Sequence, residues 1–248
     1  MARYDFASQR LFVNADLSAG KTVPLEREQI NYLVNVLRME TGAKVLIFNG
    51  RDGEWLAELV QPTRKTAVLN TLEQTRAQTP PSRITYAFAP LKSARLDYIV
   101  QKAVEMGVSA MVPVLTQRTQ VNRLKDERLF ANAIEAAEQC GILSLPVIHP
   151  ECKFAQWLRD LPATSLLVFC DEDAEAKDPI VALRAHRGAQ EIVVLIGPEG
   201  GFDPREREAL LARAGTCRLS LGPRILRADT AAVAALAAVQ IALGDWVT

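Results

Sequence analysis

A glycine-rich turn in the C-terminal third of the chain is the first segment whose residue types could do chemistry. It is GPEGG, residues 197–201, and it follows the apolar run IVVLI. Glycines let a backbone approach a ligand closely, and ligands of open α/β sheets bind beyond the carboxyl ends of the strands. The turn lacks the motifs of phosphate-binding and dinucleotide-binding loops, and Glu199 would repel a phosphate. A ligand with hydroxyls, an amine or a positive centre fits better.

A second turn of the same design follows in LGPRILRADTA, residues 221–231. Arg227 and Asp229 place charge beside it, next to the alanine-rich stretch 230–243. Simpler alternatives stay open, because GPEGG could be a plain turn before a helix, and Arg227 and Asp229 could form a local ion pair with Asp229 or Thr230 as a helix cap. After the first turn, the DPRE segment predicts a helix start, with Asp203 as N-cap and Glu206 closing a capping box. That helix should end near Gly215.

The elements that position these turns alternate in type. Short apolar runs predict strands at 84–90, 111–115, 165–170, 191–197 and 217–222, and helical patterns lie at 95–106, 126–140 and 230–243. This alternation predicts an α/β domain with a mostly parallel sheet and helices on both faces. The first seventy residues are β-rich, with strands expected at 10–13, 44–48, 55–60 and 66–69, a hairpin turn at 49–53 and one helix at 27–38. We therefore expect domains at 1–74 and 83–248, joined by a proline-containing linker at 75–82.

Composition and charge bear on nucleic-acid binding, metal binding and cellular location. The chain has 248 residues, and its 29 basic and 29 acidic residues cancel, so any binding of nucleic acid depends on a local basic patch. The chain has four cysteines without a CxxC pair and only two histidines, so we do not expect a zinc site. No segment has the pattern of a signal peptide or a membrane span, which predicts a cytoplasmic protein.

The two turns together resemble the signature of the 16S rRNA (uracil-N3)-methyltransferase family of the SPOUT superfamily. Other segments resemble that family as well: RLFV at 10–13, NYLVNVLRM at 31–39, FAPLK at 88–92, QKAVEMGV at 101–108, QRT at 117–119 and EAAEQC at 135–140. The resemblance implies a small N-terminal PUA-like β-barrel that contacts RNA and a C-terminal trefoil-knotted methyltransferase domain. It also implies a homodimer, S-adenosylmethionine held in the knot, no metal, and methylation of the N3 of a uridine in 16S rRNA of the small subunit.

The resemblance implies that three loops hold the methyl donor, at Phe169–Glu172, Ile196–Gly201 and Leu219–Thr230. The residues that it implies for cofactor binding are Cys170, Glu172, Ile196, Gly197, Pro198, Glu199, Gly200, Gly201, Leu219, Leu221, Gly222, Ile225, Leu226, Arg227 and Thr230. For catalysis we expect Arg227 to stabilise negative charge on a uracil oxygen, with Glu199 and Asp229 as the carboxylates inside the two turns. A basic track for RNA phosphates is expected at Arg10, Arg38, Lys92, Arg118, Arg123 and Lys125.

Three positions depart from the pattern of that family. Asn31 stands where a histidine is expected, Ile142 where an arginine is expected, and Asp229 where a glutamate is expected. These departures leave open an alternative, an RNA-binding or ribosome-assembly protein of the same fold without catalytic activity. A third possibility, a nucleotide-hydrolysing α/β enzyme, is disfavoured because the phosphate-binding lysine motif is missing.

Overall fold

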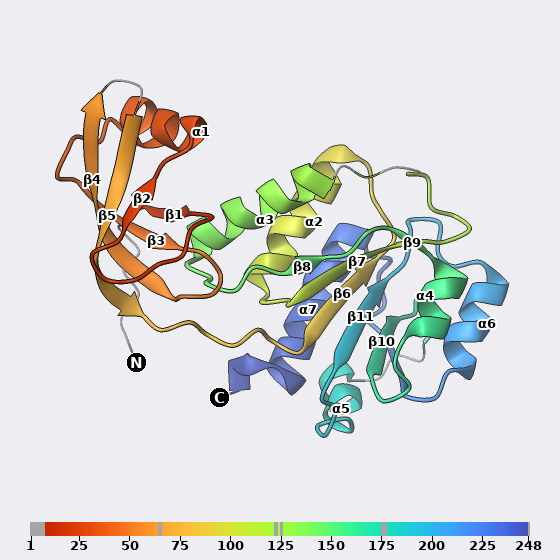
Figure 1. The fold of residues 1–248 in the computed structure, drawn as a ribbon. Coiled ribbons are helices and arrows are strands. Elements are labelled where there is room, and N and C mark those ends of the chain that lie inside the picture. The colour runs from red at the N-terminus through yellow and green to blue at the C-terminus, as the bar shows by residue number, and fades with distance from the viewer. Residues whose placement is uncertain (1–7, 64–65, 122–123, 125, 175–177, 248) are drawn as a thin grey trace. The chain divides into compact units, whose positions relative to one another are not determined.

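The chain divides into two compact units (Figure 1). The computed structural model describes residues 8–63, 66–121, 124, 126–174 and 178–247. The N-terminal unit comprises Met1–Pro80 and Ala137–Leu145, and the C-terminal unit comprises Pro81–Ala136 and Pro146–Thr248. The last strand of the N-terminal unit ends at Arg76, so it enters the segment expected to be a linker.

The N-terminal unit is built on a five-stranded sheet with the order β1-β3-β4-β5-β2. The strands are β1 Arg10–Phe12, β2 Thr22–Pro24, β3 Lys44–Phe48, β4 Glu54–Thr63 and β5 Thr66–Arg76. β1 runs parallel to β3, and the other neighbours are antiparallel. The four predicted strands are confirmed, whereas β2 was missed. The predicted helix is split into α1 Arg27–Ile30 and a π-helical turn, η1 Asn31–Val36.

The connection between β3 and β4 is the predicted hairpin turn. Gly50 and Gly53 adopt φ of 81° and 79°, which glycine tolerates best. The side-chain oxygen of Asn49 accepts hydrogen bonds from the N–H groups of Arg51 at 2.9 Å and Asp52 at 2.8 Å. A Cβ on Gly53 would lie 2.3 Å from a backbone carbonyl oxygen of β5, so the turn has no room for a side chain there.

One buried carboxylate organises the polar contacts of the N-terminal unit. Glu54 accepts hydrogen bonds from Nε of Arg10 at 2.9 Å, Nη2 of Arg76 at 2.6 Å and the hydroxyl of Thr75 at 2.8 Å. Burial alone would raise the pKa of Glu54, but hydrogen bonds from Arg76, Thr75 and Arg10 outweigh it and hold that pKa below its usual value. Arg10 is itself only 7% exposed. The expectation that Arg10 meets RNA phosphates is therefore wrong, because the guanidinium is buried against Glu54.

Replacing Glu54 by glutamine is expected to lower the free energy of unfolding by about 3 kcal/mol near neutral pH, because two arginines lose their buried anion. The pKa of Glu54 is lowered from 4.5 on folding, so its contribution is present above that value and is lost as the pH falls through the folded-state pKa. The difference between wild type and E54Q should shrink below about pH 4 in urea unfolding curves. A difference that stays constant under acidic conditions would contradict this assignment.

The C-terminal unit contains a parallel sheet with the order β12-β10-β11-β6-β7-β8, and β9 pairs with β7. The strands are β6 Ile84–Phe88, β7 Ala110–Leu115, β8 Val147–Ile148, β9 Cys152–Lys153, β10 Leu166–Cys170, β11 Ile192–Ile196 and β12 Thr216–Leu219. All five predicted strands are confirmed. Every residue of β11 is buried, as expected for a central strand covered on both faces.

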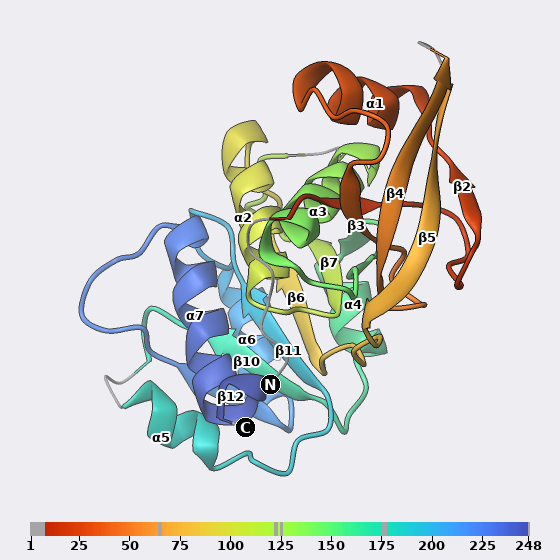
Figure 2. The ribbon, with the colours of Figure 1, turned by 90° about the vertical axis from the view of Figure 1, so that its left-hand side faces the viewer.

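Helices cover both faces of this sheet. They are α2 Ser93–Glu105, α3 Asp126–Cys140, α4 Phe154–Asp160, α5 Pro179–Arg184, α6 Pro204–Ala212 and α7 Ala228–Leu243, with a 3₁₀ turn η2 at Asp245–Val247. Alternate residues of the strands, including Phe169 and Leu195, pack against α4 and α6. α7 packs with α2 and α5 (Figure 2). The three predicted helices are confirmed to within a few residues.

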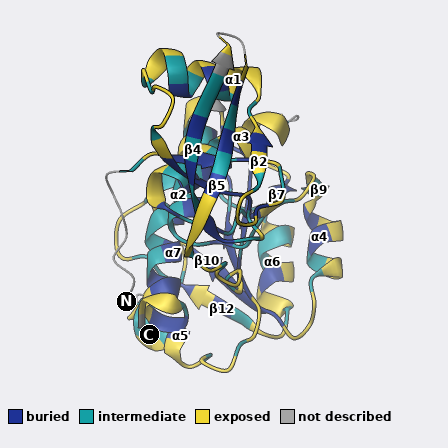
Figure 3. Ribbon diagram, turned by 60° about the vertical axis from the view of Figure 1, so that its left-hand side comes forward, coloured by how far each residue is buried: buried dark blue, intermediate teal, exposed yellow. Residues whose placement is uncertain are grey.

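Helix α7 is rich in alanine, and more than half of its residues are buried (Figure 3). Ala228, Ala232 and Ala235 are buried, and their small side chains allow neighbouring elements to approach closely. The side-chain amide of Gln240 is buried and donates a hydrogen bond to the carbonyl of Met106 at 2.6 Å, which ties α7 to the end of α2. In the part of the chain that the structure describes, no helix combines the length and apolarity needed to cross a membrane.

Candidate functional site

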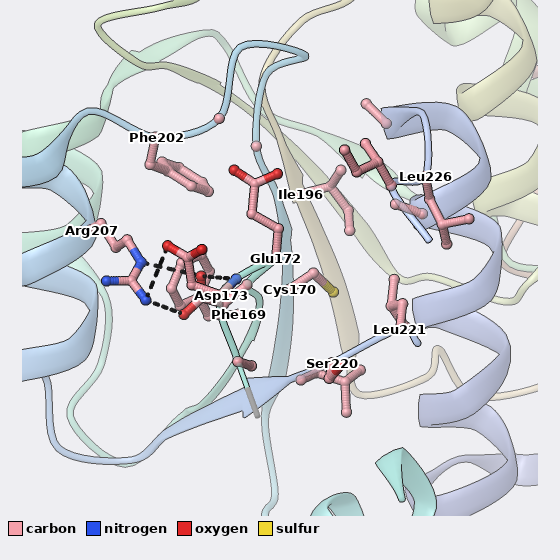
Figure 4. Close-up of a pocket in the computed structure, with 18 of the residues that line it drawn as sticks. Phe169, Cys170, Glu172, Asp173, Ile196, Phe202, Arg207, Ser220, Leu221 and Leu226 are labelled. Atoms are coloured by element: carbon pink, nitrogen blue, oxygen red, sulfur yellow. Dashed lines mark hydrogen bonds and ion pairs between the residues drawn. The ribbon is translucent and has the colours of Figure 1, made fainter. Parts of the chain in front are cut away.

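Three segments of the C-terminal unit enclose a pocket of about 940 Å³ (Figure 4). They are residues 169–174 at the end of β10 and in the loop that follows, residues 196–204 from the end of β11 to the start of α6, and residues 219–228 from the end of β12 to the start of α7. β10 lies between β11 and β12 in the parallel sheet, so the carboxyl ends of the three strands meet at one edge. Both glycine-proline turns therefore line the same pocket.

The first turn depends on its glycines. The N–H of Gly201 donates a hydrogen bond to the carbonyl of Pro198 at 2.9 Å, and Gly201 has a φ of 70°. A Cβ on Gly197 would lie 2.6 Å from the ring of Phe202. That ring is fixed by an edge-on contact with Phe169, with centroids 5.4 Å apart. The turn therefore reaches this conformation only without a side chain at position 197.

The helix after the first turn starts as predicted. Asp203 accepts a hydrogen bond from the N–H of Arg205 at 3.0 Å, and Glu206 accepts one from the N–H of Asp203 at 3.1 Å. Pro204 occupies the first helical position. The capping box is confirmed, although α6 ends at Ala212, before Gly215.

The second turn enters its helix differently from the prediction. Arg227 is the N-cap of α7, with extended backbone angles and no capping bond from its side chain. Asp229 lies in the first turn of the helix, where its carboxylate accepts a hydrogen bond from the N–H of Thr230 at 2.9 Å. The prediction that Asp229 or Thr230 caps the helix is therefore wrong, because the helix begins at Ala228. Among the described residues, no ion pair joins Arg227 to Asp229.

Two arginines, Arg95 and Arg118, contact the first turn. Arg95 of α2 forms an ion pair with Glu199, and Nη1 of Arg118 donates a hydrogen bond to the carbonyl of Gly200 at 2.6 Å. The pairing with Arg95 neutralises Glu199, so this carboxylate adds less negative charge to the pocket than the sequence suggests. Arg95 was not predicted as a site residue.

The loop after β10, which the resemblance implies for donor binding, contains a buried carboxylate whose partners were not predicted. Asp171 follows β10 and accepts hydrogen bonds from Nη2 of Arg207 at 2.9 Å and from Nη2 of Arg218 at 2.7 Å. Burial alone would raise the pKa of Asp171, but the bonds from Arg207 and Arg218 outweigh it and hold that pKa below its usual value. Asp171 is therefore a fixed negative charge at the pocket.

The thiol of Cys170 lines the pocket as a neutral group. Burial, with a smaller effect from Cys217 on the neighbouring strand, raises the pKa of Cys170 to about 12. The thiol is therefore protonated at neutral pH and acts as a small apolar surface.

Most of the residues predicted to bind a cofactor lie in the pocket wall. Those that line it are Cys170, Glu172, Ile196, Gly197, Pro198, Glu199, Gly201, Leu219, Leu221, Gly222, Ile225, Leu226 and Arg227. Gly200, Asp229 and Thr230 are not among the described residues that do so. Phe169, Asp171 and Ser220, which lie within the three predicted loops, also line the pocket. The structure adds residues outside those loops, among them Phe202, Arg207, Glu208 and Leu211.

Of the residues predicted to meet phosphates, Lys92 and Arg118 line the same small pocket. Arg38 is exposed in the N-terminal unit, and Lys92 and Arg118 are exposed in the C-terminal unit. Arg123 and Lys125 lie outside the described residues.

Comparison with known proteins assigns the chain to a family. Residues 78–240 match the family model of an RNA methyltransferase domain, and residues 25–72 match that of an RNA methyltransferase PUA domain. The chain belongs to the RNA methyltransferase family. The N-terminal unit thus contains its PUA domain, and the pocket lies in the RNA methyltransferase domain.

Relatives in this RNA methyltransferase family match nearly the whole chain. A protein named ribosomal RNA small subunit methyltransferase E from Synechocystis is 32% identical, over 94% of this chain and 78% of its own length. The protein of the same name from Rickettsia conorii is 29% identical, over 94% of this chain and 95% of its own length.

Two solved structures show the same fold. The structure of ribosomal RNA small subunit methyltransferase E from Neisseria gonorrhoeae, bound to S-adenosyl methionine, has a TM-score of 0.83 and 30% identity and covers 96% of this chain and 99% of its own. A methyltransferase from Legionella pneumophila in complex with the same cofactor has a TM-score of 0.81 and 28% identity, over 96% of this chain and 99% of its own.

Proposed function

We propose that this RNA methyltransferase transfers the methyl group of S-adenosylmethionine to the N3 of a uridine in 16S rRNA of the small ribosomal subunit. The observation that carries the proposal is the pocket between the two glycine-proline turns. It lies in a fold shared with a 30% identical enzyme that was solved with that cofactor. The relatives named above act on small-subunit ribosomal RNA.

The pocket fits the donor in its chemistry. S-adenosylmethionine supplies, when bound, a methyl group on a positively charged sulphur. Glu172 and Glu208 bring carboxylates to the pocket wall, and Ile196, Leu219 and Leu226 bring apolar surface. Carboxylates accept hydrogen bonds from hydroxyl and ammonium groups and favour a cation over a phosphate. We assign the three pocket segments to donor binding on this ground.

Arg227 is our candidate for a residue that acts on the uracil. It is exposed and lines the pocket, and among the described residues its guanidinium makes no hydrogen bond or ion pair. The proton on N3 must leave, and the negative charge then spreads onto the uracil oxygens, which a guanidinium can stabilise with forked donors. Glu199 and Asp229 remain candidates for accepting that proton, although Glu199 is paired with Arg95.

The exposed side chains of Arg38, Lys92 and Arg118 are our candidates for phosphate contacts. Replacing Lys92 by alanine should reduce the slope of log affinity for RNA against log salt by about one unit. Fluorescence anisotropy with a 16S rRNA fragment at several salt concentrations measures that slope. An unchanged slope would remove Lys92 from the set.

Several features of the biological setting follow from the same proposal. We expect a homodimer with a trefoil-knotted methyltransferase domain, acting in the cytoplasm during ribosome biogenesis. The side chain of Ile225 at the pocket wall is 93% exposed, which favours its burial by a partner subunit or by RNA. Light scattering at several protein concentrations tests the dimer, and a monomer at all of them would contradict it.

Mapping of ribosomal RNA tests the proposed function directly. Mass spectrometry of 16S rRNA from cells that lack this protein should show the loss of one N3-methyluridine, and the purified protein should restore the mark on small subunits. Calorimetry should show binding of S-adenosylmethionine. RNA binding without donor binding would support the inactive RNA-binding alternative instead.

A further inference from the structure

The loop after β10 is held by charged residues that do not come from the two glycine turns. It comprises residues 171–174, and it brings Glu172 to the pocket wall. Asp171, whose side chain is 2% exposed, stands at its base and pairs with Arg207 on α6 and with Arg218 on β12. The carboxylate of Asp171 thus connects the loop after β10 to α6 and to β12.

Asp171 also fixes the backbone of the loop. Its side chain accepts a hydrogen bond from the N–H of Asp173 at 3.2 Å, and its carbonyl accepts one from the N–H of Ala174 at 3.1 Å. Arg218 donates both to Asp171 and, at 3.1 Å, to the carbonyl of Asp173. Glu172 lies between these anchored residues, so the direction of its side chain follows from the contacts of Asp171.

Glu172 points into the pocket, between Phe202 and Ile196 (Figure 4). Its Oε1 lies 3.2 Å from the position that a Cβ on Gly201 would take, so the carboxylate rests against the first glycine turn. Among the described residues, its carboxylate makes no hydrogen bond. It therefore remains available to a ligand.

Charge pairing explains why Glu172 stays available. Arg207 lines the same pocket and would be a natural partner for Glu172, but its Nε and Nη2 donate to Asp171 at 3.2 and 2.9 Å. Asp171, together with Asp173, whose Oδ2 lies 3.6 Å from Nη2 of Arg207, thus keeps this guanidinium away from Glu172. Without Asp171, Arg207 could swing to Glu172 and cancel the negative charge that a cationic donor requires.

We propose that Asp171, together with Arg207 and Arg218, is a positioning residue that holds Glu172 in the pocket to accept hydrogen bonds from the hydroxyl or ammonium groups of S-adenosylmethionine. The inference rests on the proposed function and adds to it a set of residues that act on the donor through Glu172.

A double-mutant cycle on donor affinity tests this inference. Asp171→Asn and Glu172→Gln should each weaken S-adenosylmethionine binding by about tenfold in calorimetry, and the double variant should bind no more weakly than E172Q alone. Non-additivity is the expected result, because Asp171 acts through the group that E172Q already removes. A merely structural role would lower the melting temperature without this coupling.

Two Arg218 variants and one control variant keep the test independent of folding. Arg218 does not line the pocket in the described part of the chain, yet R218A should weaken donor binding several-fold, and R218K should recover part of it. E54Q is the matched control, because it also removes a buried carboxylate that pairs with two arginines, but in the N-terminal unit. It should bind the donor with wild-type affinity.

Each outcome decides the matter. If the wild-type protein binds S-adenosylmethionine but D171N binds it equally well, or if the losses of D171N and E172Q multiply in the double variant, the inference is overturned and the proposed function stands. If the wild-type protein does not bind S-adenosylmethionine, both are overturned.

Discussion

Replacing Arg227 by alanine is expected to lower the turnover number by about a hundredfold while changing the Kd of S-adenosylmethionine by less than about threefold. Arg227 contributes its backbone to the start of α7, but its guanidinium makes no hydrogen bond or ion pair among the described residues. Its loss should therefore affect the charge that develops on the uracil oxygen and not the donor already bound. Single-turnover kinetics with small subunits, together with calorimetry, measure the two quantities separately.

Two variants sharpen the comparison for Arg227. R227K keeps the charge but loses the forked donors, so its turnover should lie between those of wild type and R227A. Arg205 is exposed on α6 outside the pocket wall, and R205A should behave like wild type. Equal losses of turnover and donor affinity in R227A would indicate that Arg227 only supports the fold of the second turn.

Replacing Gly197 by alanine is expected to weaken donor binding by about tenfold or more, because the new Cβ would lie 2.6 Å from the ring of Phe202. That ring also packs against Phe154 and Phe169, so it cannot move without disturbing the core between α4 and the sheet. The turn must therefore shift, and because Gly197 lines the pocket, the shape of the pocket changes with it. Calorimetry with S-adenosylmethionine gives the loss directly.

Gly200 provides a matched control on the same turn. A Cβ there would meet only the side chain of Arg118, at 3.6 Å, which is an ordinary contact distance. G200A therefore makes the same chemical change without a clash and should bind the donor within about threefold of wild type. Equal effects of G197A and G200A would show that the loop tolerates side chains and that its glycines do not shape the pocket.

The local features of the fold could be predicted because their causes lie within a few residues in sequence. The hairpin turn at 49–53 depends on glycines at positive φ, and the start of α6 depends on Asp203 and Glu206, three residues apart. The alternation of apolar runs and helical patterns likewise predicted the parallel sheet. The arrival of both glycine turns at one edge then follows from parallel strands.

The features that were missed depend on partners far away in the chain. Asp171 pairs with Arg207 and Arg218, which lie 36 and 47 residues further along the chain. Arg10 pairs with Glu54, which lies 44 residues further along. Nothing in the local pattern around Arg10 distinguishes a buried arginine from a surface one. Asp171 itself lies in a loop that the resemblance implies for donor binding, but no local pattern indicates that Arg207 and Arg218 are its partners.

The N-terminal unit is discontinuous in sequence, and this affects how the chain can be divided. Residues 137–145 belong to it, and Glu138 accepts a hydrogen bond from the N–H of Phe12 at 2.8 Å, while the carbonyl of Gly141 accepts one from Arg76 at 2.9 Å. A fragment that stops at Pro80 would lose both of these hydrogen bonds, one to the edge strand β1 and one to the end of β5. An excised PUA domain would therefore need this short downstream peptide, either fused through a linker or added in trans.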